Sequence, residues 1–208
     1  MRCLAAFMEW LPSAFKEHSE EQQITRKFSH SFSHVFATVC LIALLLLFSG
    51  RGTLLASTSS EYKLKAAFIY NFAKFVSWPP AAFSGSNDPI ILGLIDGDPF
   101  GGSIDDALEG KTAQKRQIQV KRIKSIADAK KCHILYINST QSSRVNEILS
   151  ALRGNSILTI GEADKFTSIG GIIHFVVHKQ RVAFKINNEQ AKNVDLAISS
   201  QLLKLAVD

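Results

Sequence analysis

A glycine-rich turn is the chain's clearest candidate for ligand chemistry. Residues 97–102, Gly-Asp-Pro-Phe-Gly-Gly, follow an apolar run at 90–95. Open α/β sheets bind ligands where their parallel strands end, and the amides of such a turn can meet an anion at the start of the next helix. The candidate ligand residues are Asp98, Phe100, Gly101 and Gly102. Because the turn lacks the Lys-Ser/Thr ending of a phosphate loop and the full dinucleotide spacing, a simple structural turn is the favoured alternative.

The other titratable residues do not form a recognisable catalytic or metal motif. The aspartates at 96, 98, 105 and 106 could hold a cation, but acids at a helix N-terminus also stabilise its dipole, which is the favoured reading. His174 and His178 lie on one side of a predicted strand, yet their backbones are about 13 Å apart. Cys132 begins an apolar run and is expected to be a small buried residue. We therefore expect no enzyme activity, metal or cofactor.

Charge gives a weak indication of the partner. The 208-residue chain has a formal net charge of +6, and the segment 111–131 is rich in Lys and Arg. A solvated face is the favoured interpretation. The narrower hypothesis is that Lys121, Arg122 and Lys124 contact acidic groups on a partner or anionic lipid. The segment lacks interleaved aromatic residues, so we expect no nucleic-acid binding.

The apolar periodicity predicts an α/β fold. Runs of strand length alternate with helical patterns, which is typical of parallel strands joined by helices. The expected fold is a single three-layer domain with a mostly parallel sheet flanked by helices and a C-terminal β-hairpin. Strands are predicted at 90–95, 118–123, 134–137, 157–160, 172–178 and 181–186. Helices are predicted from Ser59 or Ser60 to about 76, and at 104–108, 126–131, 142–152 and after Ser199 or Ser200.

The first of these helices is apolar on two sides. One stripe, expected to lie on the sheet, contains Leu64, Ala67, Phe68, Phe72 and Phe75. The opposite stripe contains Tyr62, Ala66, Ile69, Ala73 and Val76. A helix with two apolar sides is either enclosed within its own domain or completed by another chain. We weigh the two alternatives equally, with Tyr62, Ile69, Ala73 and Val76 as the partner-binding candidates.

The N-terminal region indicates export. Basic Arg26 and Lys27 precede an apolar run at 35–48, and small residues follow at 56–57. This order predicts a signal peptide at 1–56 and an exported domain at 57–208. The alternative is an uncleaved membrane anchor at 29–50, with the rest of the chain again outside the cytoplasm. In either case the expected location is the periplasm.

Seven blocks along the exported part together resemble the YfiR-like family. They lie in order at 61–78, 97–101, 132–137, 158–161, 170–175, 184–187 and 198–205. The resemblance implies a periplasmic α/β domain, usually a homodimer, that binds the periplasmic portion of a membrane-bound diguanylate cyclase and restrains it. It also implies release through an outer-membrane lipoprotein, which raises cyclic di-GMP and favours biofilm formation.

One position departs from the family pattern. Some members pair a cysteine in the first strand with the one equivalent to Cys132, but this chain has Gly93 where the partner would be. The redox-dependent stabilisation seen in such relatives is therefore not carried over to this chain. The leading functional prediction is a non-enzymatic periplasmic repressor of an inner-membrane signalling protein. The alternative is a periplasmic small-ligand sensor that uses the turn at 97–102.

Overall fold

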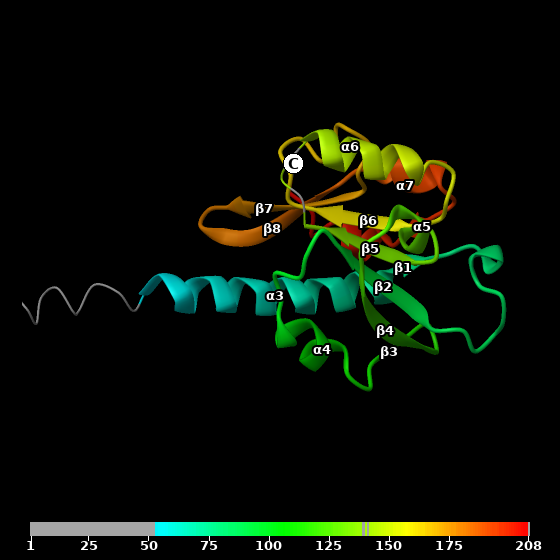
Figure 1. The fold of residues 1–208 in the computed structure, drawn as a ribbon, viewed down its shortest axis with the longest axis horizontal. Helices are drawn as coiled ribbons and strands as arrows, with labels where there is room; N and C mark the ends of the chain where they lie inside the picture. The colour runs from blue at the N-terminus through cyan, green and yellow to red at the C-terminus, as the bar shows by residue number, and fades with distance from the viewer. Residues whose placement is uncertain (1–52, 139, 141, 208) are drawn as a thin grey trace, which may run out of the picture. The chain divides into compact units, whose positions relative to one another are not determined.

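The computed structural model describes residues 53–138, 140 and 142–207, and their centre is a curled, mostly parallel sheet (Figure 1). Seven strands lie in the order β3-β4-β2-β5-β6-β7-β8. Their bounds are β2 (Ile90–Ile95), β3 (Thr112–Ala113), β4 (Arg116–Ile123), β5 (Ile134–Ile137), β6 (Leu158–Gly161), β7 (Ile173–His178) and β8 (Arg181–Ile186). The pairings from β4 through β2, β5 and β6 to β7 are parallel. Continuous apolar runs form β2, β5 and β6 because both faces of these strands are covered.

Helices cover both faces of this sheet, as predicted. They are α3 (Thr53–Phe75), α4 (Gly102–Leu108), α5 (Ile126–Ala129), α6 (Ser142–Ala151), α7 (Asn188–Asn193) and α8 (Ser200–Leu203), with a short 3-10 turn at Pro80–Ala82. One buried cluster joins the α3 side to the sheet, and a second joins the sheet to α6. The two clusters confirm the expected three-layer arrangement. Together they give residues 55–208 a core of their own.

The C-terminal hairpin is also confirmed. β7 and β8 pair antiparallel from Ile173↔Ile186 to His178↔Arg181. Their turn consists of Lys179 and Gln180, both with left-handed backbone angles, φ 49° and 61°. Such angles match the twist of a two-residue hairpin, although Gly or Asn usually supplies them.

Some local features differ from the sequence prediction. The two-stranded pair of β1 (Val76–Ser77) and β9 (Ala197–Ile198), the short β3 and the helix α7 were not predicted. Helix α3 begins at Thr53, before the expected Ser59 or Ser60 cap, since no Pro or Gly interrupts residues 53–60. Except for the start of α3, the predicted signal peptide at 1–56 and the alternative anchor at 29–50 lie outside the described residues. Within the described ranges, no helix combines the length and apolar character needed to cross a membrane.

Candidate functional site

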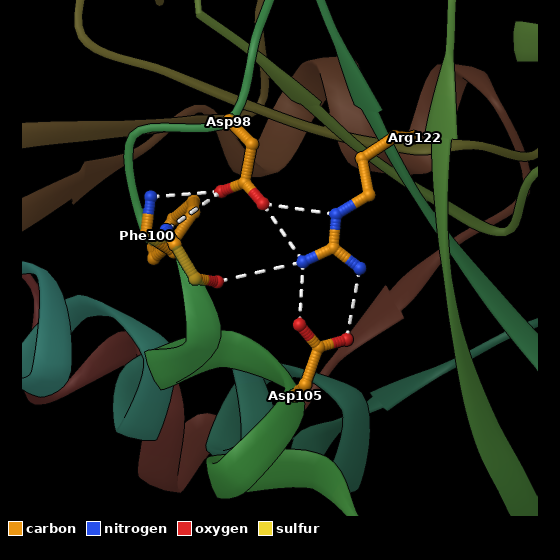
Figure 2. Close-up of polar contacts among 5 residues, drawn as sticks. Asp98, Phe100, Asp105 and Arg122 are labelled. Atoms are coloured by element: carbon orange, nitrogen blue, oxygen red, sulfur yellow. Dashed lines mark hydrogen bonds and ion pairs between the residues drawn. The ribbon is translucent and has the colours of Figure 1, made fainter.

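The predicted ligand turn is held by its own aspartate and by an arginine from the neighbouring strand (Figure 2). Asp98 Oδ1 accepts hydrogen bonds from the backbone N–H groups of Phe100 at 2.8 Å and Gly101 at 3.2 Å. The guanidinium of Arg122, on β4, lies 2.8 Å from Asp98 Oδ2 and donates to Asp105 Oδ1 at 2.9 Å. Because Arg122 donates these hydrogen bonds to Asp105, the pKa of that carboxyl is lowered. The arrangement ties the turn and the first turn of α4 to the sheet.

This geometry brings together a partner-binding candidate and a ligand-binding candidate that the sequence pattern assigns to separate sites. Arg122 was a partner-binding candidate, and Asp98 was a ligand candidate, yet they form an ion pair with each other. Phe100 is only 4% exposed and therefore belongs to the core. Gly101, Gly102 and Lys121 are exposed. The favoured reading of the turn as a structural element fits these contacts, and ligand binding at 97–102 stays a prediction.

Aromatic side chains fill the crevice where a ligand would be expected in this topology. The chain leaves β2 toward β4 and then returns across the sheet to β5, so β2 and β5 flank the point where strand order reverses. Open α/β sheets bind ligands outside the carboxyl ends of such strands. Here Phe100, just after β2, packs edge-on against Tyr136 of β5 at 4.8 Å and against Tyr62 of α3 at 5.4 Å between ring centroids. Helix α3 therefore closes the usual position with its own side chains.

A buried lysine beside these rings was missed by the sequence analysis. Lys65 is 2% exposed, and its Nζ lies 2.5 Å from Glu61 and 2.7 Å from Glu162. The hydroxyl of Tyr136 donates to the other carboxylate oxygen of Glu162. Burial alone would lower the pKa of Lys65, but the hydrogen bonds to Glu162 and Glu61 outweigh it, and the pKa is raised. Burial and the neighbouring Glu162 raise the pKa of Tyr136. Lys65 is thus held as a cation that anchors α3 to the end of β6.

A small notch opens next to this lysine. A cavity of about 300 Å³ is lined by Glu61, Lys65, Glu162, Asp164, His174 and residues 175–177. Burial lowers the pKa of His174, so this ring is neutral near pH 7. The notch is therefore acidic, with three carboxylates around the single ammonium of Lys65.

Helix α3 buries residues from both of its predicted stripes, since Phe72 of the expected sheet-facing stripe is also fully buried. Ile69, Ala73 and Val76 are at most 1% exposed and pack in the domain's own core. The predicted sheet-facing side includes Leu64, 45% exposed, and Ala67, also exposed. Of the two alternatives for this stripe, enclosure within its own domain is the one that fits Ile69, Ala73 and Val76, and these three partner-binding candidates are not exposed to another chain. Tyr62 is half-buried against Phe100.

The distribution of aromatic rings explains why both stripes are buried. Phe72 packs edge-on against Phe184 at 5.0 Å between centroids, and half-buried Phe68 reaches the same ring at 5.4 Å. Phe68 and Phe72, on one side of α3, thus cover the β8 end of the curled sheet. The small side chains of Ala66 and Ala73 then allow the other stripe to lie close against the central strands.

At the opposite, amino end of the strands, Cys132 and His133 border a larger cavity. Its volume is about 610 Å³, and Phe83, Lys130 and Asp195 also line it. Burial raises the pKa of the Cys132 thiol to about 11, so the thiol is protonated and a poor nucleophile, as its predicted structural role requires. His133 stacks on Phe83 at 4.3 Å between ring centroids.

The His133 ring is held as one tautomer. The backbone N–H of Ile91 donates to Nδ1 at 3.0 Å, so Nε2 carries the proton that meets the carbonyl of Ala82 at 3.0 Å. Burial lowers the pKa of the ring. A neutral, doubly bonded histidine of this kind is a structural element. No group of three or more potential metal-ligating His, Cys, Asp or Glu side chains occurs in the described part of the chain.

The fold and these contacts define an α/β domain in which, among the described residues, every buried polar side chain has a hydrogen-bond partner. Comparison of the sequence with models of protein families identifies the family of this domain. The chain belongs to the YfiR/HmsC-like family, whose model matches residues 62–207. No individually curated protein matches the chain. The family resemblance stated from the sequence blocks is therefore confirmed.

Proposed function

We propose that the chain is a non-enzymatic periplasmic regulator that binds and restrains the periplasmic portion of an inner-membrane signalling protein, a diguanylate cyclase. The observation that carries the proposal is membership of the YfiR/HmsC-like family over residues 62–207. The paired state of the polar residues supports it. Arg122 is bound by Asp98 and Asp105, Lys65 by Glu61 and Glu162, and the Cys132 thiol is protonated.

Regulation by contact needs a difference in affinity between two states of the partner. The domain must bind the silent cyclase more tightly than the active one, and each tenfold preference contributes about 1.4 kcal/mol to the shift. An outer-membrane lipoprotein that competes for the domain would reverse the shift. A homodimer is the proposed assembly, as the family resemblance implies, and a closed two-fold arrangement is the commonest form of homo-oligomer.

The test is the cellular level of cyclic di-GMP in the native bacterium. Deleting the coding sequence should raise cyclic di-GMP and surface attachment, and restoring the full chain should lower both. The matched control is a chain that lacks residues 1–56 and is retained in the cytoplasm, which should fail to complement. Deletion in a strain whose candidate cyclase is catalytically inactive should have no effect. An equal level of cyclic di-GMP in the deletion strain and the parent strain would contradict the proposal.

The cavity beside His133 supports a second candidate, a periplasmic small-ligand sensor. At about 610 Å³ it is large enough for a drug-sized molecule, and it offers both an aromatic ring and charged groups. A ligand that binds only the folded state raises the thermal midpoint, and the shift grows with the logarithm of the ligand concentration above its Kd. A screen of periplasmic metabolites by thermal shift, repeated with Ser156→Trp to fill the cavity, would identify such a ligand. Shifts that persist in the filled variant would argue against this site.

A further inference from the structure

The hairpin at the end of the sheet has one unpaired edge. Every residue of β7 pairs with β8, but on the other side β6 pairs with β7 only at Ile160↔Ile173 and Gly161↔His174. Figure 1 shows the hairpin continuing past the end of β6. Within the described residues, the outer half of β7, from Phe175 to His178, therefore has no strand on that side.

The register shows which backbone groups face this edge. The N–H of Asn187 donates to the carbonyl of Ile172 at 2.8 Å, which places Ile172 in a hydrogen-bonded antiparallel pair. Alternation then directs the backbone groups of His174, Val176 and His178 toward β8. The N–H and C=O groups of Phe175 and Val177 point the other way. The side chain of Val177 is 71% exposed, so the edge has an apolar contact as well.

The acidic notch lies directly along this edge. Its lining includes Val176 and Val177 of β7, together with Glu61, Glu162 and Asp164. Glu61 and Glu162 share the ammonium of Lys65, whereas exposed Asp164 forms no ion pair within the described part of the chain. Lys185 on β8 and His174 on β7 are the other basic groups near the notch, and the ring of His174 is neutral near pH 7. A basic side chain would complete the charge balance here.

We propose that the open edge of β7 binds an extended, basic segment of a protein partner by strand addition. The segment continues the line of β6, hydrogen-bonds the backbone of Val177, and places a Lys or Arg side chain in the notch beside Asp164. The inference rests on the proposed function in that the segment belongs to the regulated partner. Free edges are usually blocked by proline, a bulge or a covering loop, and this stretch of β7 has no proline.

The hairpin is suited to such a role because its tip is fixed. Lys179 and Gln180 hold left-handed backbone angles, which are unfavourable for residues other than glycine. The pairing of all six residues on each strand maintains this turn. A preformed edge lowers the entropy that an incoming strand must lose on binding.

The probe is a fluorescent peptide, acetyl-Lys-Val-Thr-Val-Lys-Val-amide, with a matched peptide in which Glu replaces both Lys residues. Its binding to the protein, produced with its own N-terminal segment, is followed by anisotropy. Val177→Pro removes the edge N–H and leaves the β8 ladder intact, and Asp164→Lys reverses the charge in the notch. Val177→Thr and Asp106→Lys are the matched controls, the latter at an exposed aspartate of α4.

We expect Val177→Pro and Asp164→Lys each to weaken binding of the Lys peptide about tenfold or more, and the controls to change it less than about twofold. The Glu peptide should bind at least about tenfold more weakly than the Lys peptide. If Val177→Pro does not fold, the Asp164→Lys result decides the question. Absence of Lys-peptide binding, or equal binding by all variants, would overturn the proposal.

Two other binding partners of the β7 edge, a second copy of this chain or a lipid surface, give distinct results, and each result would overturn the proposal. Self-association that Val177→Pro abolishes, without peptide binding, would assign the edge to a second copy of this chain. Binding to phosphatidylglycerol vesicles that Lys179→Glu and Arg181→Glu abolish, without peptide binding, would assign the tip to lipid. If deletion of the chain changes cyclic di-GMP but no peptide binds, only this inference fails. If the Lys peptide binds but deletion of the chain leaves the level of cyclic di-GMP unchanged, only the proposed function fails.

Discussion

A Cβ atom on Gly93 would lie 2.6 Å from the Sγ atom of Cys132, which precedes the neighbouring strand β5. The same atom would lie 3.1 Å from the terminal methyl groups of Ile123 and Leu135. Glycine at this position of β2 is therefore required by packing, since its backbone angles are ordinary. Because residue 93 is a glycine and not a cysteine, Cys132 is a free, buried thiol.

Gly93→Ala should destabilise the domain by about 1 to 3 kcal/mol, because one extra methyl group overpacks this part of the core. The measurement is the free energy of unfolding from denaturant titration. Gly85→Ala is the matched control: its added Cβ would meet only the Asp88 side chain, at 3.4 Å, and the change should stay within about 0.5 kcal/mol.

Removing the Cys132 thiol tests whether the sulfur is the source of the clash. The double variant Gly93→Ala, Cys132→Ala should be more stable than the sum of the two single changes predicts, by about 0.5 kcal/mol or more. Additive effects would show that Ile123 and Leu135, and not the sulfur, set the cost.

Gly93→Cys should form a disulfide with Cys132 under oxidising conditions. Closing a loop of about 40 residues should contribute about 2 to 4 kcal/mol of stability, which dithiothreitol removes. Peptide mapping identifies the bond, and unfolding with and without reductant measures its effect. Gly93→Ser, which has similar bulk but no sulfur, should be destabilised in both conditions. Equal unfolding of the Cys and Ser variants under oxidising conditions would contradict the prediction.

The strands could be predicted from the sequence because they are short, continuous apolar runs, and β2, β5 and the hairpin lie within one residue of their predicted bounds. The orientation of α3 could not be predicted from the sequence, because both of its long sides are apolar. Its true inward side carries Lys65, whose charge ordinarily indicates solvent. The partner that permits burial, Glu162, is 97 residues away in sequence. The spacing of Glu61 and Lys65 was the only local signal of the site.

The same reason explains the ligand turn. The spacing of residues 97–102 correctly placed a turn at the end of β2. That Asp98 meets Arg122 depends on β2 and β4 being neighbours in register, with Leu94 opposite Arg122. Local sequence does not contain that register, so one ion pair was interpreted as two separate candidate sites.

Lys65→Met should destabilise the domain by about 2 kcal/mol, because Glu162 then loses its cation in a partly buried place. Lys65→Met combined with Glu162→Gln should recover part of this loss, since the remaining amide is neutral. Lys63→Met, at an exposed position of the same helix, is the matched control and should change stability by less than about 0.5 kcal/mol. Similar unfolding of the Lys65 and Lys63 variants would show that the buried network does not anchor α3.

The buried His133 predicts that the domain loses stability on mild acidification. Its pKa is below the ordinary value of 6.5 because burial disfavours the charged ring, so below that pH the unfolded chain binds a proton that the folded one does not. Stability should therefore fall as pH drops from about 6.5 toward the folded-state pKa, by at most about 1.4 kcal/mol per pH unit from this group.

His133→Gln isolates this contribution. Denaturant midpoints of the wild type and the variant should be compared at about pH 7.5 and about pH 5.5, which bracket the ordinary histidine pKa. The variant is expected to be less stable at the higher pH, because it loses the ring stacked on Phe83, but to lose less stability on acidification. His174→Gln reports the separate contribution of the other histidine whose pKa is lowered. An unchanged pH dependence in His133→Gln would mean that the ring accepts a proton without cost, contrary to its two hydrogen bonds to the backbone.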